Sequence, residues 1–309
     1  MPILDESAKG VFIISITPFT EAGELDLDST DSLVDFYLDK GVTGITILGV
    51  MGEAPKLTPQ ESTAFVERVA RRIDGRIPIV VGASNPGLIP MKTLVDRVMD
   101  LGAAGVMVSP TPGLKTDDAI YNYFDLVCQT IGDTPLVVQD YPQLSGVVMS
   151  NALVNRLVKS FPQFKVFKHE DCPGLSKITA MRRAETEGTR RVSILVGNGA
   201  LYYPQELARG VDGAMTGFAY PEMLVQVHQK FAAGDAEGAE DLFDAYLPYV
   251  RHEQQPVMGL ALRKQTLYQR GAIASPRVRA PGPKLTPVDL EELQKMTARL
   301  ERRLAALGA

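Results

Sequence analysis

A lysine and a glutamate stand two residues apart near the end of one apolar run, at Lys168 and Glu170. In a strand, Val166 and Lys168 point to the same face, so the amine is expected to lie where the valine lies. If that face is buried, loss of solvation favours the neutral amine, which is the form that attacks a carbonyl carbon. The alternative is a lysine that is simply paired with Glu170 at the end of a strand.

Four other polar residues follow apolar runs at their carboxyl ends, namely Gln139, Tyr141, Asn198 and Thr216. Gln139 can orient a water or a substrate hydroxyl but exchanges no proton at neutral pH, whereas Glu170 can act as an acid or a base. Tyr141 has the strand parity of Gln139, so it can reach the same space. Asn198 and Thr216 are candidate ligands for substrate hydroxyls. Each of these residues could instead serve the structure alone, by pairing with a cation, by hydrogen bonding or by capping a loop.

A short glycine-containing loop follows another apolar run, with Val50, Met51 and Gly52 between Gly49 and Glu53. Backbone N–H groups in such a loop can bind a carboxylate. The three amides of Val50, Met51 and Gly52 are therefore the candidate carboxylate site. The alternative is an ordinary tight turn, since glycines on both sides of a turn need no ligand.

Eight short apolar runs recur along the chain, and each is followed by a polar strand end and an amphipathic stretch of helical period. The runs lie at 11–16, 45–48, 77–81, 105–108, 135–138, 165–168, 192–196 and 213–216. The first three helical stretches lie at 28–38, 59–69 and 90–101. Apolar strands that alternate with amphipathic helices indicate parallel strands covered by helices, and eight such units predict a (β/α)8 TIM barrel. Active sites of these barrels lie at the carboxyl ends of the strands, where the polar residues above are found.

The pattern changes after the eighth run. Helices are predicted at 222–233, 235–272 and 287–307, with an Ala-Pro-Gly-Pro linker at 280–283. We therefore expect a barrel catalytic domain over residues 1–221 and a C-terminal helical region, 222–309, packed on the barrel.

Composition excludes several classes of protein. The 309 residues carry 45% hydrophobic and 22% charged residues, which is typical of a folded globular chain and not of a disordered one. The net charge is −5 without a basic block, so we expect no nucleic-acid or membrane partner. The N-terminus lacks a secretory signal and no apolar run reaches the length of a membrane span, so a cytoplasmic location is expected.

Few residues are suited to a metal. Cys128 and Cys172 are the only cysteines, and the three histidines, His169, His228 and His252, are scattered along the chain. They cannot form a disulfide framework or a cysteine-rich or histidine-based metal site, although carboxylates could still hold a cation. We expect no metal and no cofactor.

The ordered set of Thr17-Pro18-Phe19, Gly49-x-x-Gly52-Glu53 and Lys168 at the end of the sixth run resembles the dihydrodipicolinate synthase / N-acetylneuraminate lyase family. The resemblance extends from about residue 9 to the C-terminal helices. It implies a pyruvate-type class I enzyme on a (β/α)8 barrel, in which Lys168 forms a Schiff base with a 2-keto acid. It also implies a homotetramer.

Several positions depart from the synthases and lyases of that family. Val50 and Met51 stand where Ser or Thr is usual, Gln139 where a relay tyrosine is usual, and Leu144 where an arginine binds the second carboxylate. Thr111 and the proline after it replace a second relay tyrosine. These departures argue against condensation of pyruvate with aspartate semialdehyde.

A branch of the family that dehydrates 2-keto-3-deoxy sugar acids, the 2-keto-3-deoxyarabonate dehydratases, is more similar. The shared traits are Val138-Gln139-Asp140, Lys168-x-Glu170, Gly-Ala-Met-Thr-Gly at 213–217 before Tyr220-Pro221, and His252-Glu253. The favoured function is therefore a lyase that dehydrates a 2-keto-3-deoxy sugar acid through a Schiff base on Lys168. The alternatives are a retro-aldol or aldol lyase, a dihydrodipicolinate synthase-type condensation with pyruvate, and a barrel that binds a keto acid without catalysis.

Overall fold

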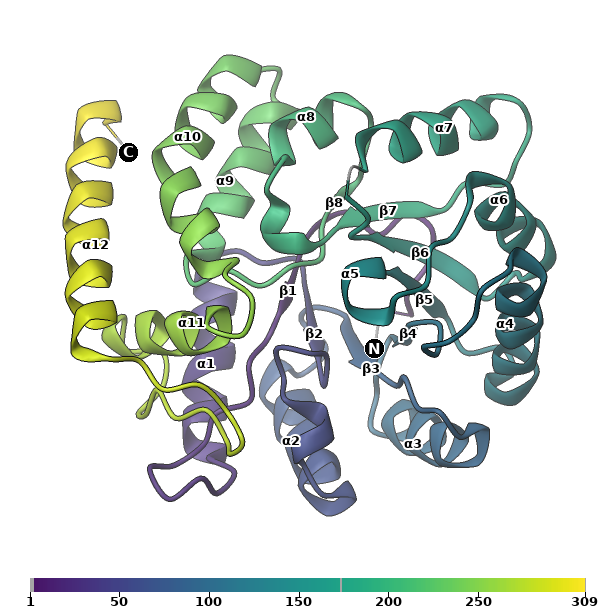
Figure 1. The fold of residues 1–309 in the computed structure, drawn as a ribbon, viewed down its shortest axis with the longest axis horizontal. Helices are drawn as coiled ribbons and strands as arrows, with labels where there is room; N and C mark the ends of the chain where they lie inside the picture. The colour runs from purple at the N-terminus through teal and green to yellow at the C-terminus, as the bar shows by residue number, and fades with distance from the viewer. Residues whose placement is uncertain (1–2, 173, 309) are drawn as a thin grey trace.

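Eight parallel strands close into a barrel in the computed structural model, which describes residues 3–172 and 174–308 (Figure 1). Each strand pairs in parallel with the next in the chain, and β8 pairs with β1. The strands are β1 (Gly10–Ile14), β2 (Gly44–Ile47), β3 (Ile79–Gly82), β4 (Gly105–Val108), β5 (Leu136–Asp140), β6 (Phe164–His169), β7 (Ser193–Val196) and β8 (Gly213–Ala214). The (β/α)8 barrel predicted from the eight apolar runs is confirmed.

Helices surround the barrel, and α10, α11 and α12 gather on one side of it, at the left of Figure 1. The first six helices are α1 (Leu27–Asp39), α2 (Pro59–Ile73), α3 (Leu88–Asp100), α4 (Asp117–Ile131), α5 (Pro142–Ser145) and α6 (Asn151–Ser160). The others are α7 (Leu175–Thr186), α8 (Tyr203–Ala208), α9 (Pro221–Ala232), α10 (Ala236–Glu253), α11 (Gly259–Gln269) and α12 (Pro287–Leu307). Two short 3-10 helices, η1 (Ala54–Lys56) and η2 (Asn198–Ala200), lie in the loops after β2 and β7.

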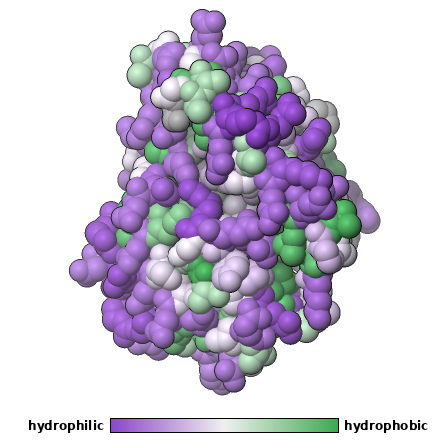
Figure 2. Space-filling model, turned by 90° about the vertical axis from the view of Figure 1, so that its left-hand side faces the viewer, coloured by the Kyte–Doolittle hydropathy of each residue, from purple (hydrophilic) through white to green (hydrophobic). Residues whose placement is uncertain are grey.

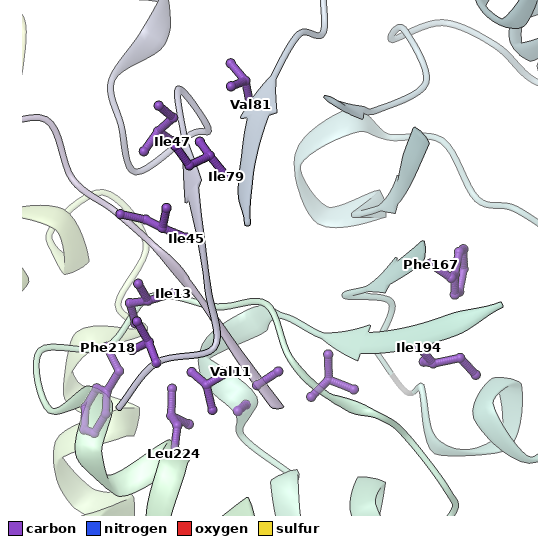
Figure 3. Close-up of a cluster of buried hydrophobic side chains, with 14 of the residues drawn as sticks. Val11, Ile13, Ile45, Ile47, Ile79, Val81, Phe167, Ile194, Phe218 and Leu224 are labelled. Carbon is purple, nitrogen blue, oxygen red and sulfur yellow. The ribbon is translucent and has the colours of Figure 1, made fainter. Parts of the chain in front are cut away.

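Each strand is buried on both faces, which explains why the strands read as nearly continuous apolar runs. One face packs against the surrounding helices. Figure 3 shows Val11, Ile13, Ile45, Ile47, Ile79 and Val81 of this face. The other face fills the barrel with Phe12, Ile14, Val80, Met107, Val137, Val166, Leu195 and Met215. Because Val166 belongs to this inner set and Phe167 to the outer one, the face that Val166 and Lys168 share is the inner one, which the sequence left open.

Local signals set the helix ends. Thr58 caps α2 in a capping box with Glu61, and the Ser150 side chain accepts a hydrogen bond from the backbone N–H of Leu153 at the start of α6. Gly41 and Gly102 follow α1 and α3 with positive φ, a conformation that glycine adopts without strain. These ends agree with the sequence to within a few residues.

The helix predicted over 235–272 is wrong as a single element, because the structure divides it into α10 and α11. The break falls between Glu253 and Gly259, at a segment that contains Pro256 and Val257. A proline lacks the N–H that an α-helix needs, and Val257 has φ of 69°. The break turns the chain back toward the barrel, and Gln254 within it reaches the barrel mouth.

The helices after β8 pack tightly on the barrel and on one another. Helix α9 contacts β1 and α10, and α10 contacts α11 and α12. In the described part of the chain no helix has the length and apolarity that a membrane span requires. Figure 2 shows the side on which α12 lies, where apolar groups are scattered among hydrophilic ones. The boundary between 221 and 222, the homotetramer and the cytoplasmic location stay predictions.

A buried lysine on α11 joins the C-terminal region to the loop after β2. Lys264 Nζ donates hydrogen bonds to Glu53 Oε1 at 2.6 Å, to the Thr17 carbonyl at 2.8 Å and to the Arg277 carbonyl at 2.9 Å. Glu53 Oε2 accepts from the backbone N–H of Arg279 at 3.0 Å. The ion pair therefore anchors the loop that carries Val50 to two segments distant in sequence.

We expect Lys264→Met to lower the free energy of unfolding by about 3 kcal/mol, because buried Glu53 would keep Lys56, which is 25% exposed, but lose its fully buried cation, and the Thr17 and Arg277 carbonyls would lose their donor. Denaturant unfolding followed by circular dichroism measures this loss. Lys92→Met is the matched control, since Lys92 is 52% exposed in its pair with Asp96 and should change stability by less than about 0.5 kcal/mol. Equal stability of the two variants would contradict the anchoring role of Lys264.

Candidate active site

One cavity lies at the carboxyl ends of the strands, and almost all of the predicted site residues line it. The loops after β2, β5, β6, β7 and β8 contribute these residues, which are Val50, Met51, Gln139, Tyr141, Lys168, Glu170, Asn198 and Thr216. Gly52 is the exception and does not line the cavity. Among the described residues, Lys168 is the one lysine in the lining.

Lys168, Glu170 and Gln139 form a buried hydrogen-bonded group at the centre of this cavity. Lys168 Nζ lies 2.7 Å from Glu170 Oε1, and the two side chains are 6% and 7% exposed. Gln139 Nε2 donates to the same oxygen at 2.7 Å. The other oxygen, Glu170 Oε2, accepts from the backbone N–H of Asn198 at 3.1 Å. The ion pair that the sequence left open therefore exists, and it places a proton acceptor within direct reach of the amine.

The loop after β2 leaves two of its three candidate amides free. The N–H of Gly52 donates to the Gly49 carbonyl at 3.0 Å, and the Gly52 carbonyl accepts from Thr17 Oγ1 at 2.6 Å. The Gly52 amide is thus used inside the turn and cannot hold a substrate carboxylate without breaking that turn. Within residues 3–172 and 174–308, the amides of Val50 and Met51 donate no hydrogen bond. These two amides remain as candidate donors.

Tyr141 follows β5 and faces the cavity as the N-cap of α5. Burial and the nearby charge of Glu170 both raise the pKa of the Tyr141 phenol. The phenol therefore keeps its proton at neutral pH, so it can donate a hydrogen bond or a proton but cannot act as a base. Tyr141 can therefore supply a proton, whereas the Glu170 carboxylate can accept one.

Asn198 and Thr216 hold the loop after β7 as well as lining the cavity. Thr216 Oγ1 accepts from the backbone N–H of Gly199 at 2.9 Å, and Asn198 adopts φ of 51° at the start of η2. The Thr216 hydroxyl still has a proton to donate. Both the structural role and the substrate-binding role that the sequence allowed therefore remain compatible with this geometry.

Two polar side chains that line the cavity were not found by sequence reasoning. Gln254 comes from the break between α10 and α11, and Arg263 comes from α11 itself. Because 235–272 reads as one continuous helix, nothing in its spacing places either residue at the mouth of the barrel. The buried partner of Arg263, Glu253, lies ten residues earlier, beyond the spacing of neighbours on one helix.

A third buried lysine, Lys177, joins β5 to α7. Lys177 Nζ contacts Asp140 Oδ2 and Asp171 Oδ2, each at 2.8 Å, and donates to the Met149 carbonyl at 2.9 Å. Burial alone would lower the pKa of Lys177, but the two carboxylates raise it above its ordinary value. Lys177 therefore stays charged and bound. His169 lies here too, with Nε2 at 3.0 Å from the Gly174 carbonyl, so it points away from Lys168 as predicted.

Residues 7–303 match the Dihydrodipicolinate synthetase family. The chain belongs to this family. In the part of the chain that the structure describes, no group of three or more His, Cys, Asp or Glu side chains could hold a metal ion.

Relatives within the family carry out different reactions. L-2-keto-3-deoxyarabonate dehydratase of Azospirillum brasilense is 29% identical over 297 residues, which cover 95% of this chain and 94% of the relative. A 4-hydroxy-tetrahydrodipicolinate synthase of Oceanobacillus iheyensis is 26% identical over 299 residues, which cover 94% of this chain and 97% of the relative. A crystal structure described as dihydrodipicolinate synthase from Rhodopseudomonas palustris is 43% identical, with a TM-score of 0.95, and covers 97% of this chain and 100% of its own. Family membership establishes a lyase fold and class but leaves the reaction open.

Proposed function

We propose that this chain is a Schiff-base-forming lyase that dehydrates a 2-keto-3-deoxy sugar acid. The observation that carries the proposal is the 2.7 Å contact between Lys168 Nζ and Glu170 Oε1 in a buried barrel mouth. The pair supplies a nucleophile and a proton carrier side by side, and Gln139 holds the carboxylate in place. The similarity to the Azospirillum brasilense dehydratase supports the same reaction.

Schiff-base formation begins with a proton transfer from the Lys168 ammonium to Glu170. The neutral amine then adds to the C2 carbonyl carbon of the substrate. Glu170 returns its proton to the resulting C2 hydroxyl, which leaves as water and gives a positively charged iminium. The free amides of Val50 and Met51 would hold the substrate carboxylate during these steps.

Dehydration follows from the electron-withdrawing iminium. Glu170 removes a proton from C3, and the electrons form an enamine. The enamine expels the C4 hydroxide, which takes a proton from Glu170 or from Tyr141 and leaves as water. Addition of water at C2 then releases the unsaturated 2-keto acid and the free amine. The C3–C4 bond breaks in a retro-aldol lyase instead, and this alternative uses the same iminium.

Condensation of pyruvate with aspartate semialdehyde is the second candidate, since the 43% identical Rhodopseudomonas palustris structure is described as a dihydrodipicolinate synthase. Two features of this chain weigh against it. Leu144, at the position where the family resemblance implies a carboxylate-binding arginine, is an apolar side chain that is 57% exposed. Gln139 and Val50 supply no hydroxyl for a proton relay. Dehydration needs neither a relay tyrosine nor that arginine.

A panel of substrates tests the reaction directly. We expect a five- or six-carbon 2-keto-3-deoxy acid to lose water, which the mass of the product measures. We expect no dihydrodipicolinate from pyruvate and aspartate semialdehyde. Pyruvate release from the deoxy acid would identify a retro-aldol lyase instead. Condensation at ordinary enzyme rates would refute the dehydratase.

We expect Lys168→Ala to abolish both turnover and the borohydride-trapped adduct with pyruvate, because no other lysine lines the described cavity. The variant should keep its circular dichroism spectrum, since the substitution removes no part of the apolar core. Lys92→Ala, at an exposed lysine, controls for nonspecific trapping. Trapping at an unchanged level in Lys168→Ala would exclude the Schiff-base mechanism, and absence of any adduct in the unaltered protein would favour a barrel that only binds keto acids.

We expect Glu170→Gln to slow turnover by roughly a factor of 10² to 10⁴, which is the usual contribution of a general acid or base. The amide keeps a hydrogen-bonding group beside Lys168 but carries no proton between atoms. Adduct formation with pyruvate at high concentration, measured by mass, should survive because the Lys168 ammonium can lose its proton to solvent. Unchanged turnover would show that another group moves the protons.

A further inference from the structure

The side chain of Arg263 is buried at the barrel mouth with part of its hydrogen-bonding capacity unused. Its Nε donates to Glu253 Oε2 at 2.8 Å, and the two side chains are 2% and 0% exposed. Its Nη1 has no hydrogen-bond partner in residues 3–172 and 174–308, and the residue lines the same cavity as Lys168. A buried donor without a partner costs free energy, so such a group is expected to have one when the site is in use.

Two glycines leave room for the side chains of Arg263 and Gln254, because neither glycine has a Cβ. A Cβ on Gly217, which follows β8 and lines the cavity, would collide with Arg263 Nη1. A Cβ on Gly199, in the loop after β7, would collide with Gln254 Nε2. The polar groups of Arg263 and Gln254 therefore reach the barrel mouth next to two residues that have no side chain. They lie on the β7 and β8 side of the cavity, beside the strand that carries Lys168.

We propose that Arg263 Nη1, together with Gln254 of the same cavity lining, binds an oxygen of the substrate beyond C3 and selects 2-keto-3-deoxy acids with a neutral hydroxylated tail. The inference rests on the proposed function, in which C2 is joined to Lys168. The carboxylate at C1 then lies toward the amides of Val50 and Met51, after β2, which is opposite β6 in an eight-stranded barrel. The tail therefore has the β7 and β8 side available to it.

The charges of the buried site favour a monoacid. Glu253 balances Arg263 and Glu170 balances Lys168, so neither cation is left over for a second anion. A second carboxylate on the tail would be buried without a cation of its own, which is strongly unfavourable. A hydroxyl can accept from Arg263 Nη1 without adding charge. The site therefore fits an acid that ends in a hydroxymethyl group and not its dicarboxylic analogue.

Arg263→Lys tests this role, because lysine keeps the charge opposite Glu253 and removes the second donor group. The measurement is the concentration that gives half-maximal borohydride-trapped adduct with pyruvate, with a five- or six-carbon 2-keto-3-deoxy monoacid, and with the dicarboxylic analogue. We expect the variant to raise the value for the monoacid roughly tenfold to a hundredfold, the worth of one hydrogen bond from a charged donor. The value for pyruvate, which ends at C3, should stay within about twofold.

Arg270→Lys is the matched control, since Arg270 pairs with Glu222 at the end of α11 and does not line the cavity. A double variant, Glu253→Gln with Arg263→Gln, removes both charges together if Arg263→Lys fails to fold, and the same shift is expected from it. The inference would be overturned if Arg263→Lys raised the half-maximal concentration equally for pyruvate and the monoacid, or raised it for neither. So would an unaltered protein that prefers the dicarboxylic acid. Absence of every adduct in the unaltered protein would instead refute the proposed function, and the inference with it.

Discussion

Charge burial at the mouth of the barrel is the constraint on which the rest of this structure depends. An isolated ion is very costly to bury, so each buried cation here has an anion in direct contact. The pair of Lys168 and Glu170 lies within the cavity, whereas Lys264 with Glu53 and Arg263 with Glu253 connect the C-terminal helices to it. The helices after β8 therefore form part of the site as well as a cover for the barrel.

The same constraint distinguishes the lysines. Lys177 contacts two carboxylates and a backbone carbonyl, and Lys264 contacts one carboxylate and two backbone carbonyls, so both ammonium groups are bound within the framework. Burial lowers the pKa of Lys264 to about 8, whereas two carboxylates outweigh burial at Lys177 and raise its pKa. Lys168 contacts a single carboxylate, in a cavity with room for a substrate. In the proposed mechanism, one proton transfer to Glu170 neutralises both partners at once, so the amine would become nucleophilic without leaving an unpaired buried charge.

The sequence predicted the barrel because parallel strands buried on both faces leave a strong local signal, and strand alternation placed Lys168 on the same face as Val166. It failed where the backbone conformation of a few residues decides the outcome. The division of 235–272 depends on the conformation of a few residues around Pro256, between two stretches that are helical as predicted. The use of the Gly52 amide inside its own turn depends on a loop in which Leu48 and Glu53 adopt positive φ, and neither residue type indicates this conformation.

Arg263 bears on the absence of an arginine at position 144, where this chain has Leu144. The loss of one carboxylate-binding cation does not exclude a diacid if another cation stands elsewhere in the site. Arg263 is such a cation, but Glu253 already accepts from it and is fully buried, so its charge is balanced before any substrate binds. A guanidinium whose charge is already balanced by a carboxylate still donates a directional hydrogen bond, but it attracts a second anion weakly. If both reactions pass through the iminium of the proposed mechanism, the net charge of the mouth is the property by which this site would favour a dehydratase over a synthase.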